Sequence, residues 1–273
     1  MKRQICLGLL AFGACIGTHT ASALDIKLAD IVGGGNGTGT GIVGNGINPA
    51  TGGTAPPPLF QISQTNDTNS YHSSVVNFVD GVFIPDGGAG NVTLDSAGHS
   101  YSGFPNTDSL SWDRITNGPF QNGGVSLSGV DYSSAPHSMI GFQANKGITF
   151  DLLQIAAAHP GMSATSFTAV VGMTHQGGGF GTADWWIFVD GVLEQSQLNT
   201  PGGVGFAVNI PLTGANQFLT LVSTDAGDGF IVDQIIFGDP TLNLQVPEPS
   251  AMTIAAFGLI ALARFVRRRR RDA

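Results

Sequence analysis

Short stretches of alternating apolar and polar residues, separated by turn residues, run through residues 59–244. Phe167, Ala169, Val171 and Met173 show the period of two that places side chains on one face of a β-strand. A dozen or so such strands with frequent turns predict an all-β sandwich. The further strands are expected at Asn91–Asp95, Leu110–Ile115, Val125–Leu127, Met139–Phe142, Ile148–Phe150, Trp185–Val189, Val192–Gln197, Phe206–Leu212, Phe218–Thr224 and Phe230–Phe237.

One helix and two hairpins interrupt this pattern. Asp151 can cap a helix over Leu152–Ala158, which Pro160 and Gly161 would end. The pentapeptide Phe-Val-Asp-Gly-Val occurs at residues 78–82 and again at 188–192. Asp-Gly is a preferred dipeptide of two-residue hairpins, so both copies are expected to be hairpin turns, including one within Val75–Ile84.

The segment 24–58 is expected to be a linker. It is rich in Gly, Thr and Asn from Gly33 onward and ends in three prolines, Pro56–Pro58. Such a composition offers little apolar surface to offset the entropy of ordering. The sandwich is therefore expected over residues 59–245.

The last 28 residues combine a Pro-rich motif, an apolar run and a basic end. Val246-Pro247-Glu248-Pro249 precedes Ser250–Val266, and five arginines follow at Arg267–Arg271. The apolar run would measure about 25 Å as a helix, at about 1.5 Å per residue, close to the hydrocarbon thickness of a membrane. Arg264 can snorkel to the headgroups, and the arginine block favours the cytoplasmic side. A single transmembrane helix over Ser250–Val266, within the segment 246–273, is therefore expected. The alternative is a buried C-terminal helix with a charged tail.

This tail resembles the PEP-CTERM sorting signal of Gram-negative envelope proteins, with Pro247-Glu248-Pro249 in the motif position. The resemblance implies a partner, the membrane protease exosortase, that recognises the motif and removes the tail. The membrane segment would then be temporary, as in other signals whose hydrophobic tail is discarded.

The N-terminus carries the features of a secretory signal peptide over residues 1–23. Lys2 and Arg3 precede an apolar run, and Ala21-Ser22-Ala23 forms an A-x-A cleavage site, so the mature chain should begin at Leu24. The alternative is a lipoprotein signal that uses Cys15. Because the two cysteines, Cys6 and Cys15, both lie in this segment, the mature chain would have no disulfide and no thiol ligand.

Removing both ends makes the chain strongly acidic. Residues 24–246 hold 17 carboxylates against Lys27, Arg114 and Lys146, a net charge of −14. Such a surface repels nucleic-acid phosphates. It suits a divalent cation or an uncharged partner such as a glycan, and it also favours solubility alone.

A second resemblance covers about residues 138–242. The order of Ser138–Phe142, Asn145–Leu152, Phe167–Gly172, Ile187–Gly191 and Leu219–Ser223, followed by Gly238-Asp239-Pro240, resembles the NPCBM modules. This resemblance implies a jelly-roll-like β-sandwich that binds carbohydrate. Residues 71–121 would then be extra strands packed on the module.

Sugar binding needs flat apolar faces beside polar groups. The candidates are Trp112, Trp185 and Trp186. Since neighbouring residues on a strand point to opposite faces, only one of Trp185 and Trp186 can enter the core with its own face. The other must be exposed or covered by another segment.

Asp225, Asp228 and Asp233 lie in a Gly-containing loop and are candidate ligands for a structural calcium ion. A plain turn is the alternative, because the spacing does not match the twelve-residue calcium loop.

No motif for catalysis accompanies these features. The chain has no H-E-x-x-H and no G-x-S-x-G, and nothing singles out a pair of catalytic carboxylates. The sequence thus predicts a non-enzymatic, exported envelope or matrix protein that binds a polysaccharide. The alternative is a structural or adhesive protein whose sandwich makes protein contacts.

Overall fold

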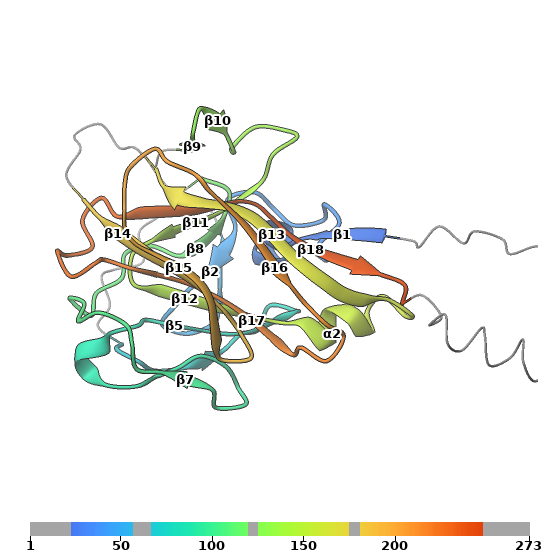
Figure 1. Ribbon diagram of the computed structural model, residues 1–273, viewed down its shortest axis with the longest axis horizontal. Helices are drawn as coiled ribbons and strands as arrows, with labels where there is room; N and C mark the ends of the chain where they lie inside the picture. The colour runs from blue at the N-terminus through green and yellow to red at the C-terminus, as the bar shows by residue number, and fades with distance from the viewer. Residues whose placement is uncertain (1–22, 57–66, 120–124, 175–180, 248–273) are drawn as a thin grey trace, which may run out of the picture.

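Two sheets packed face to face form the body of the protein (Figure 1). The computed structural model describes residues 23–56, 67–119, 125–174 and 181–247. All named strand pairs within these ranges are antiparallel. The predicted all-β sandwich is therefore confirmed.

The larger sheet has eight strands, in the order β16-β13-β18-β11-β8-β2-β3, with β1 added beside β18. Its strands are β1 (Ala23–Lys27), β2 (Gly46–Ile47), β3 (Thr54–Ala55), β8 (Ile115–Asn117), β11 (Met139–Gln143), β13 (Ser163–Met173), β16 (Phe206–Pro211) and β18 (Gln234–Gln245).

The smaller sheet has six strands, in the order β15-β14-β17-β12-β5-β4. They are β4 (His72–Ser73), β5 (Val79–Phe83), β12 (Lys146–Asp151), β14 (Ala183–Val189), β15 (Val192–Thr200) and β17 (Phe218–Thr224). Two small pairs lie outside the sheets: β6 (Val92–Thr93) with β7 (Ser100–Tyr101), and β9 (Ser126–Leu127) with β10 (Val130–Asp131).

The described residues contain two short α-helices, where the sequence predicted one, and a 3₁₀ turn, η1 (Gly87–Ala89). Helix α2 (Leu152–Ala157) is the predicted helix, and the Asp151 carboxylate caps it by accepting a hydrogen bond of 2.8 Å from the Gln154 amide. Helix α1 (Leu28–Val32) was not predicted, because its five residues are too few to show a helical period.

The main core fills the space between the sheets. Phe142 and Phe237 of the larger sheet and Phe150 and Leu221 of the smaller sheet are fully buried in it. A second apolar cluster covers the outer face of the smaller sheet and includes Trp186. The residues 91–106 thus add a layer to the sandwich rather than a separate fold.

The expected linker is wrong for the part that the structure describes. Strand β1 pairs with β18, β2 pairs with β8, and the side chains of α1 are buried. The carboxylate of Asp30 on α1 holds the Gly-rich loop by accepting hydrogen bonds from the amides of Gly37 (2.7 Å) and Gly41 (2.6 Å). The buried carboxylate of Asp30 therefore holds the Gly-rich loop in place, although the composition of this segment predicted a linker.

The two Phe-Val-Asp-Gly-Val copies fold differently. Asp190 and Gly191 have φ of 48° and 76° and turn β14 into β15, as predicted. Asp80 and Gly81 instead lie within β5, where the Tyr71 ring packs over Gly81. The hairpin expected within Val75–Ile84 is therefore wrong, because packing against Tyr71 overrides the local turn preference.

The last strand is also longer and later than predicted. Residues 230–233 form a loop, and β18 continues through Pro240 to Gln245. A register shift against β13 near Thr168 and a positive φ of 47° at Asp239 accommodate Pro240. Within the described residues, no helix has the length and hydrophobicity to cross a membrane; residues 1–22 and 248–273, where the signal peptide and transmembrane segment were predicted, lie outside them.

Candidate functional site

Three loops meet at the end of the sandwich where β11 turns into β12 and β17 leads into β18. Asn145 lies at their centre, fully buried and with a positive φ of 55°. Its side-chain amide donates to Asp108 Oδ1 (2.9 Å), to the Leu110 carbonyl (3.0 Å) and to Asp225 Oδ2 (3.0 Å). Its carbonyl accepts from the Asp225 amide at 3.0 Å. One side chain thus joins all three loops.

Five aspartates gather around this junction, and we call them the carboxylate cluster: Asp108, Asp184, Asp225, Asp228 and Asp233. Asp184, Asp225 and Asp233 are buried, whereas Asp108 and Asp228 are exposed. Repulsion among like charges adds to burial in raising the pKa of Asp184 and of Asp108. The cluster therefore offers both exposed and buried oxygens at one end of the molecule.

Asp233 is the most perturbed member of the carboxylate cluster. It is fully buried, and neither carboxylate oxygen has a hydrogen-bond partner within the described residues. Burial, and then the charges of the other four members, raises its pKa to about 9. The backbone of Gly181 lies close above it, since a Cβ there would be 2.6 Å from Asp233 Oδ1. Asp233 is therefore protonated at neutral pH unless a cation compensates its charge.

Two buried basic residues, Lys146 and Arg114, belong to the same loops, and the charge of Asp113 acts on both. Lys146 Nζ donates to the carbonyls of Trp112 (2.6 Å) and Gln143 (2.9 Å), and burial lowers its pKa to about 7. Burial also lowers the pKa of Arg114, whose Nε and Nη2 atoms have no partner among the described residues. Unpaired buried donors and acceptors are costly, so these groups lower the stability of this end of the sandwich.

Among the described residues, five of the eleven non-glycine residues with positive φ lie in the same loops. Ser109, Asp113, Ala226 and Val232 have φ between 54° and 66°, as does Asn145. For a β-branched residue such as Val232, a positive φ is a true outlier. Strained residues persist where the surrounding structure fixes them, and they are concentrated at functional sites. The loop junction is thus the best candidate for a binding site.

The structure does not support Trp185 and Trp186 as exposed sugar platforms. Their exposed fractions are only 1% and 5%. They point to opposite faces as predicted, Trp185 into the core between the sheets and Trp186 into the outer cluster. The ring of Phe104 lies edge-on to Trp186, with centroids 5.4 Å apart. Residues 91–106 therefore cover Trp186, which the sequence predicted to be either exposed or covered by another segment.

Trp112 is the least buried of the three tryptophans. It is partly exposed, and its carbonyl is the acceptor for Lys146 described above. It lies between Ser111, whose hydroxyl has no partner among the described residues, and the strained Asp113. Of the predicted aromatic residues, Trp112 alone is placed next to the loop junction with part of its surface accessible.

The predicted calcium ligands do lie near one another, but their oxygens are unequally available. Asp225 Oδ2 already accepts from Asn145 and from the Asp108 amide at 3.1 Å, and Asp228 accepts from Thr182 at 3.0 Å. Within the part of the chain that the structure describes, no three acidic, His or Cys side chains are arranged to hold a metal ion. A calcium ion at Asp225, Asp228 and Asp233 thus stays a prediction.

Sequence reasoning found the 225–233 loop but missed its partners. Asp108, Asn145, Asp184 and Lys146 are distant in sequence, and each looks ordinary by itself. The one available signal was Asn145 in a tight turn between two predicted strands, because asparagine tolerates the left-handed region. The sorting motif is described only at Val246 and Pro247, both exposed, while Glu248 and Pro249 lie outside the described residues.

Two family models match the chain. The NPCBM/NEW2 domain matches residues 108–243, and the PEP-CTERM protein-sorting motif matches residues 245–271. The first match begins at Asp108 and contains the whole carboxylate cluster. No curated protein sequence matches the chain.

Several solved structures of carbohydrate-binding modules are similar to part of the chain. One is CBM51 from Clostridium perfringens GH95 in complex with methyl-galactose, with 23% identity, coverage of 43% of this chain and 76% of that chain, and a TM-score of 0.35. Another is CBM51-2 in complex with GlcNAc and INT domains from Clostridium perfringens ZmpB, with 14% identity, coverage of 67% and 40%, and a TM-score of 0.36. A third is the tandem CBM51 modules of Sp3GH98 from Streptococcus pneumoniae, with 16% identity, coverage of 47% and 35%, and a TM-score of 0.34.

Proposed function

Because the chain carries an NPCBM/NEW2 domain followed by a PEP-CTERM sorting motif, we propose that it is an exported protein whose β-sandwich binds carbohydrate. The motif indicates export and sorting to the cell surface in Gram-negative bacteria. We propose the cell's own exopolysaccharide as the ligand, and exosortase as the protease that removes the tail. The match of the domain over residues 108–243 is the observation that carries the proposal.

The chemistry of the loop junction agrees with a polyhydroxylated, uncharged ligand. The exposed carboxylates of Asp108 and Asp228 can accept hydrogen bonds from sugar hydroxyl groups, and such charge-assisted bonds are strong. A net charge of −14 over residues 24–246 would repel an anionic polymer. A neutral glycan therefore fits this end better than a highly charged one.

Trp112 is our candidate for the apolar contact with the sugar ring. It has accessible surface, and it borders the polar groups of the loop junction, the combination that sugar recognition needs. Trp185 and Trp186 are assigned instead to structural roles, Trp185 in the main core and Trp186 in the outer apolar cluster. The chain is proposed to have no catalytic activity of its own.

The test compares two tryptophan variants of the chain, Trp112→Ala and Trp186→Ala, by affinity electrophoresis in gels that contain purified exopolysaccharide. Trp112→Ala should weaken retention about tenfold or more, which corresponds to about 1.4 kcal/mol, with little change in melting temperature. Trp186→Ala should lower the stability by about 3–5 kcal/mol, because it empties a buried aromatic cluster. Normal retention of Trp112→Ala would remove this tryptophan from the site.

One observation favours the alternative of a structural or adhesive protein. Among the strands that the structure describes, β15 pairs with β14 alone and is an edge strand, and Val192 (61% exposed) and Leu198 (50% exposed) lie on it. Such an edge can pair with a strand of another protein. Absence of retention on every polysaccharide, together with self-association that a Leu198→Lys change abolishes, would favour this function.

A further inference from the structure

The two expected processing points of the chain are neighbours in the fold. Strand β1 pairs with the end of β18, with Ala23 opposite Gln245 and Leu24 opposite Leu244. The expected signal peptide ends at Ala23, and the sorting motif begins at Val246. Paired residues of antiparallel strands lie about 5 Å apart. Both ends of the chain therefore leave the sandwich at the same place, as Figure 1 shows.

The sorting motif begins without a spacer. Gln245 is the last residue of β18, and β13 pairs with β18 on the side opposite β1, with Ser163 opposite Gln245. Leu242 and Leu244 on this part of β18 are fully buried. The sheet therefore fixes the point from which the chain leads into the motif.

The carboxylate cluster lies at the other end of the same strand. Strand β18 begins at Gln234, directly after Asp233, and has 12 residues. At about 3.3 Å per residue, its two ends are about 36 Å apart. One strand thus separates the candidate binding site from the exit point of the tail.

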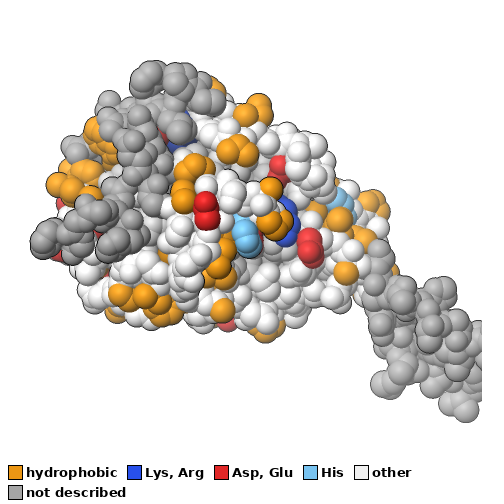
Figure 2. Space-filling model, turned by 90° about the horizontal axis from the view of Figure 1, so that it is seen from above, with side chains coloured by type: hydrophobic (Ala, Val, Ile, Leu, Met, Phe, Trp, Pro, Cys, Tyr) orange, Lys and Arg blue, Asp and Glu red, His pale blue; other side chains and the backbone are white. Residues whose placement is uncertain are grey.

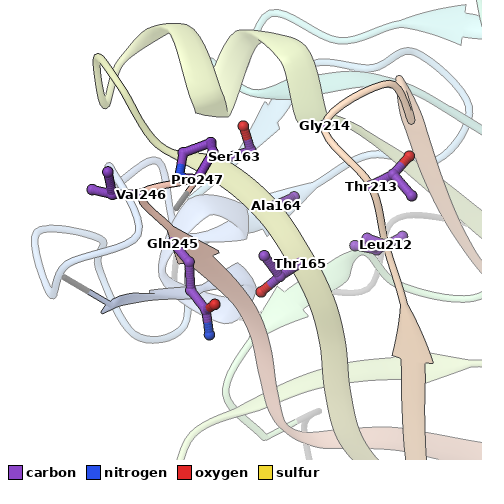
Figure 3. Close-up of a pocket in the computed structure, with 9 residues that line it drawn as sticks. All are labelled: Ser163, Ala164, Thr165, Leu212, Thr213, Gly214, Gln245, Val246 and Pro247. Carbon is purple, nitrogen blue, oxygen red and sulfur yellow. The ribbon is translucent and has the colours of Figure 1, made fainter. Parts of the chain in front are cut away.

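The segments that follow α2 and β16 carry few charges beside the exit point. The charged side chains nearest to them are Asp25 and Lys27 on β1 and Asp190, which accepts hydrogen bonds from Asn216 and Gln217. The segments 158–165 and 212–217 themselves contain no Asp, Glu, Lys or Arg, although residues 24–246 hold 17 carboxylates. These loops and the end of β18 surround a pocket of about 300 Å³, lined by Ser163, Ala164, Thr165, Leu212, Thr213, Gly214, Gln245, Val246 and Pro247 (Figure 3). On the face shown in Figure 2, acidic, basic and histidine side chains are few and most of the described surface is uncharged. Anionic headgroups would repel the carboxylate cluster more strongly than these two segments, which carry no carboxylate.

We propose that the exit end, formed by the segments 158–165 and 212–217, faces the lipid headgroups while the tail is still attached. The carboxylate cluster then points away from the membrane, about 36 Å farther out. This inference rests on the proposed membrane insertion of the tail, and it is independent of carbohydrate binding. The partner of the exit end is the phospholipid surface itself.

The test uses the chain without its signal peptide but with its tail, reconstituted into phosphatidylethanolamine–phosphatidylglycerol vesicles. Because this chain has no cysteine, single reporters can be placed by Ala215→Cys at the exit end and by Ile231→Cys, at a residue that is 71% exposed, at the far end. Each variant carries a fluorophore, and lipids with a nitroxide on the headgroup quench only fluorophores close to the membrane surface.

We expect strong quenching at position 215 and little at position 231. Equal quenching of the two positions, or no quenching of either, in chains that float with the vesicles would overturn the orientation. Chains that fail to float with the vesicles would overturn the insertion of the tail and, with it, the inference. A shift of quenching to position 231 alone would show that the opposite end faces the lipid.

Discussion

At the scale of single residues, burial decides which predicted site residues can act. Trp185 and Trp186 have the residue type that sugar binding needs, and the alternation of side chains along a strand correctly placed them on opposite faces. The sequence could not show that Tyr101 and Phe104 cover Trp186, because that contact spans more than 80 residues. Residue type was therefore predictable and accessibility was not.

Asp233 provides a prediction about pH. Its folded pKa of about 9 lies above the usual value of a carboxyl group, so the folded state holds a proton that the unfolded state loses above about pH 4. This contribution to stability is complete at low pH and is lost as the pH rises toward 9. Between pH 5 and 7, it falls by up to about 1.4 kcal/mol per pH unit.

Denaturant unfolding in EDTA at pH 5, 6 and 7 measures this effect. The Asp233→Asn variant should show a shallower loss of stability with pH than the wild-type chain, since it cannot ionise at this position. Identical slopes would contradict the raised pKa. Repeating the measurement with calcium decides the cation question: a gain in stability that Asp233→Asn abolishes would establish an ionised carboxylate that binds the ion.

At the scale of elements, local pattern predicted the central strands and missed those that depend on distant partners. Phe218–Thr224 was predicted at its observed bounds, and α2 was predicted with its Asp151 cap. The two copies of Phe-Val-Asp-Gly-Val show the limit, because identical residues form a hairpin at Asp190 and a continuous strand at Asp80. Packing against Tyr71 decides between these outcomes, and no local window contains that information.

The Gly-rich segment gives the prediction for this scale. Asp30 is buried, and its carboxylate accepts the amides of Gly37 and Gly41, so removing it leaves two amides without their partner. Asp30→Ala should lower the free energy of unfolding by about 1–3 kcal/mol. Asp25→Ala, at an exposed position on β1, is the matched control and should have little effect. Equal stability of the two variants would restore the view of this segment as a linker.

At the scale of the whole molecule, the two ends of the sandwich have different chemistry. The carboxylate cluster lies at one end, together with five of the non-glycine residues of positive φ, and both expected processing points lie at the other. Strand β18 connects the two ends. The sequence did not predict this difference between the two ends, because Asp233 and Val246 are only 13 positions apart in it.

The sorting motif is tested by one substitution in the full chain. Glu248→Ala should leave unprocessed protein in the inner membrane, because the tail would no longer be recognised and removed. Asp272→Ala removes a carboxylate outside the Pro-Glu-Pro motif and should be processed normally. Normal processing of Glu248→Ala, measured by membrane fractionation and gel mobility, would show that Pro247-Glu248-Pro249 is not the signal.

Binding of carbohydrate by the sandwich is the central claim, and a glycan array probed with residues 24–246 tests it most directly. The account predicts binding to at least one neutral or envelope polysaccharide, and weaker binding when Asp228→Asn removes an exposed carboxylate of the cluster. A folded fragment that binds no neutral or envelope polysaccharide on the array would contradict the claim.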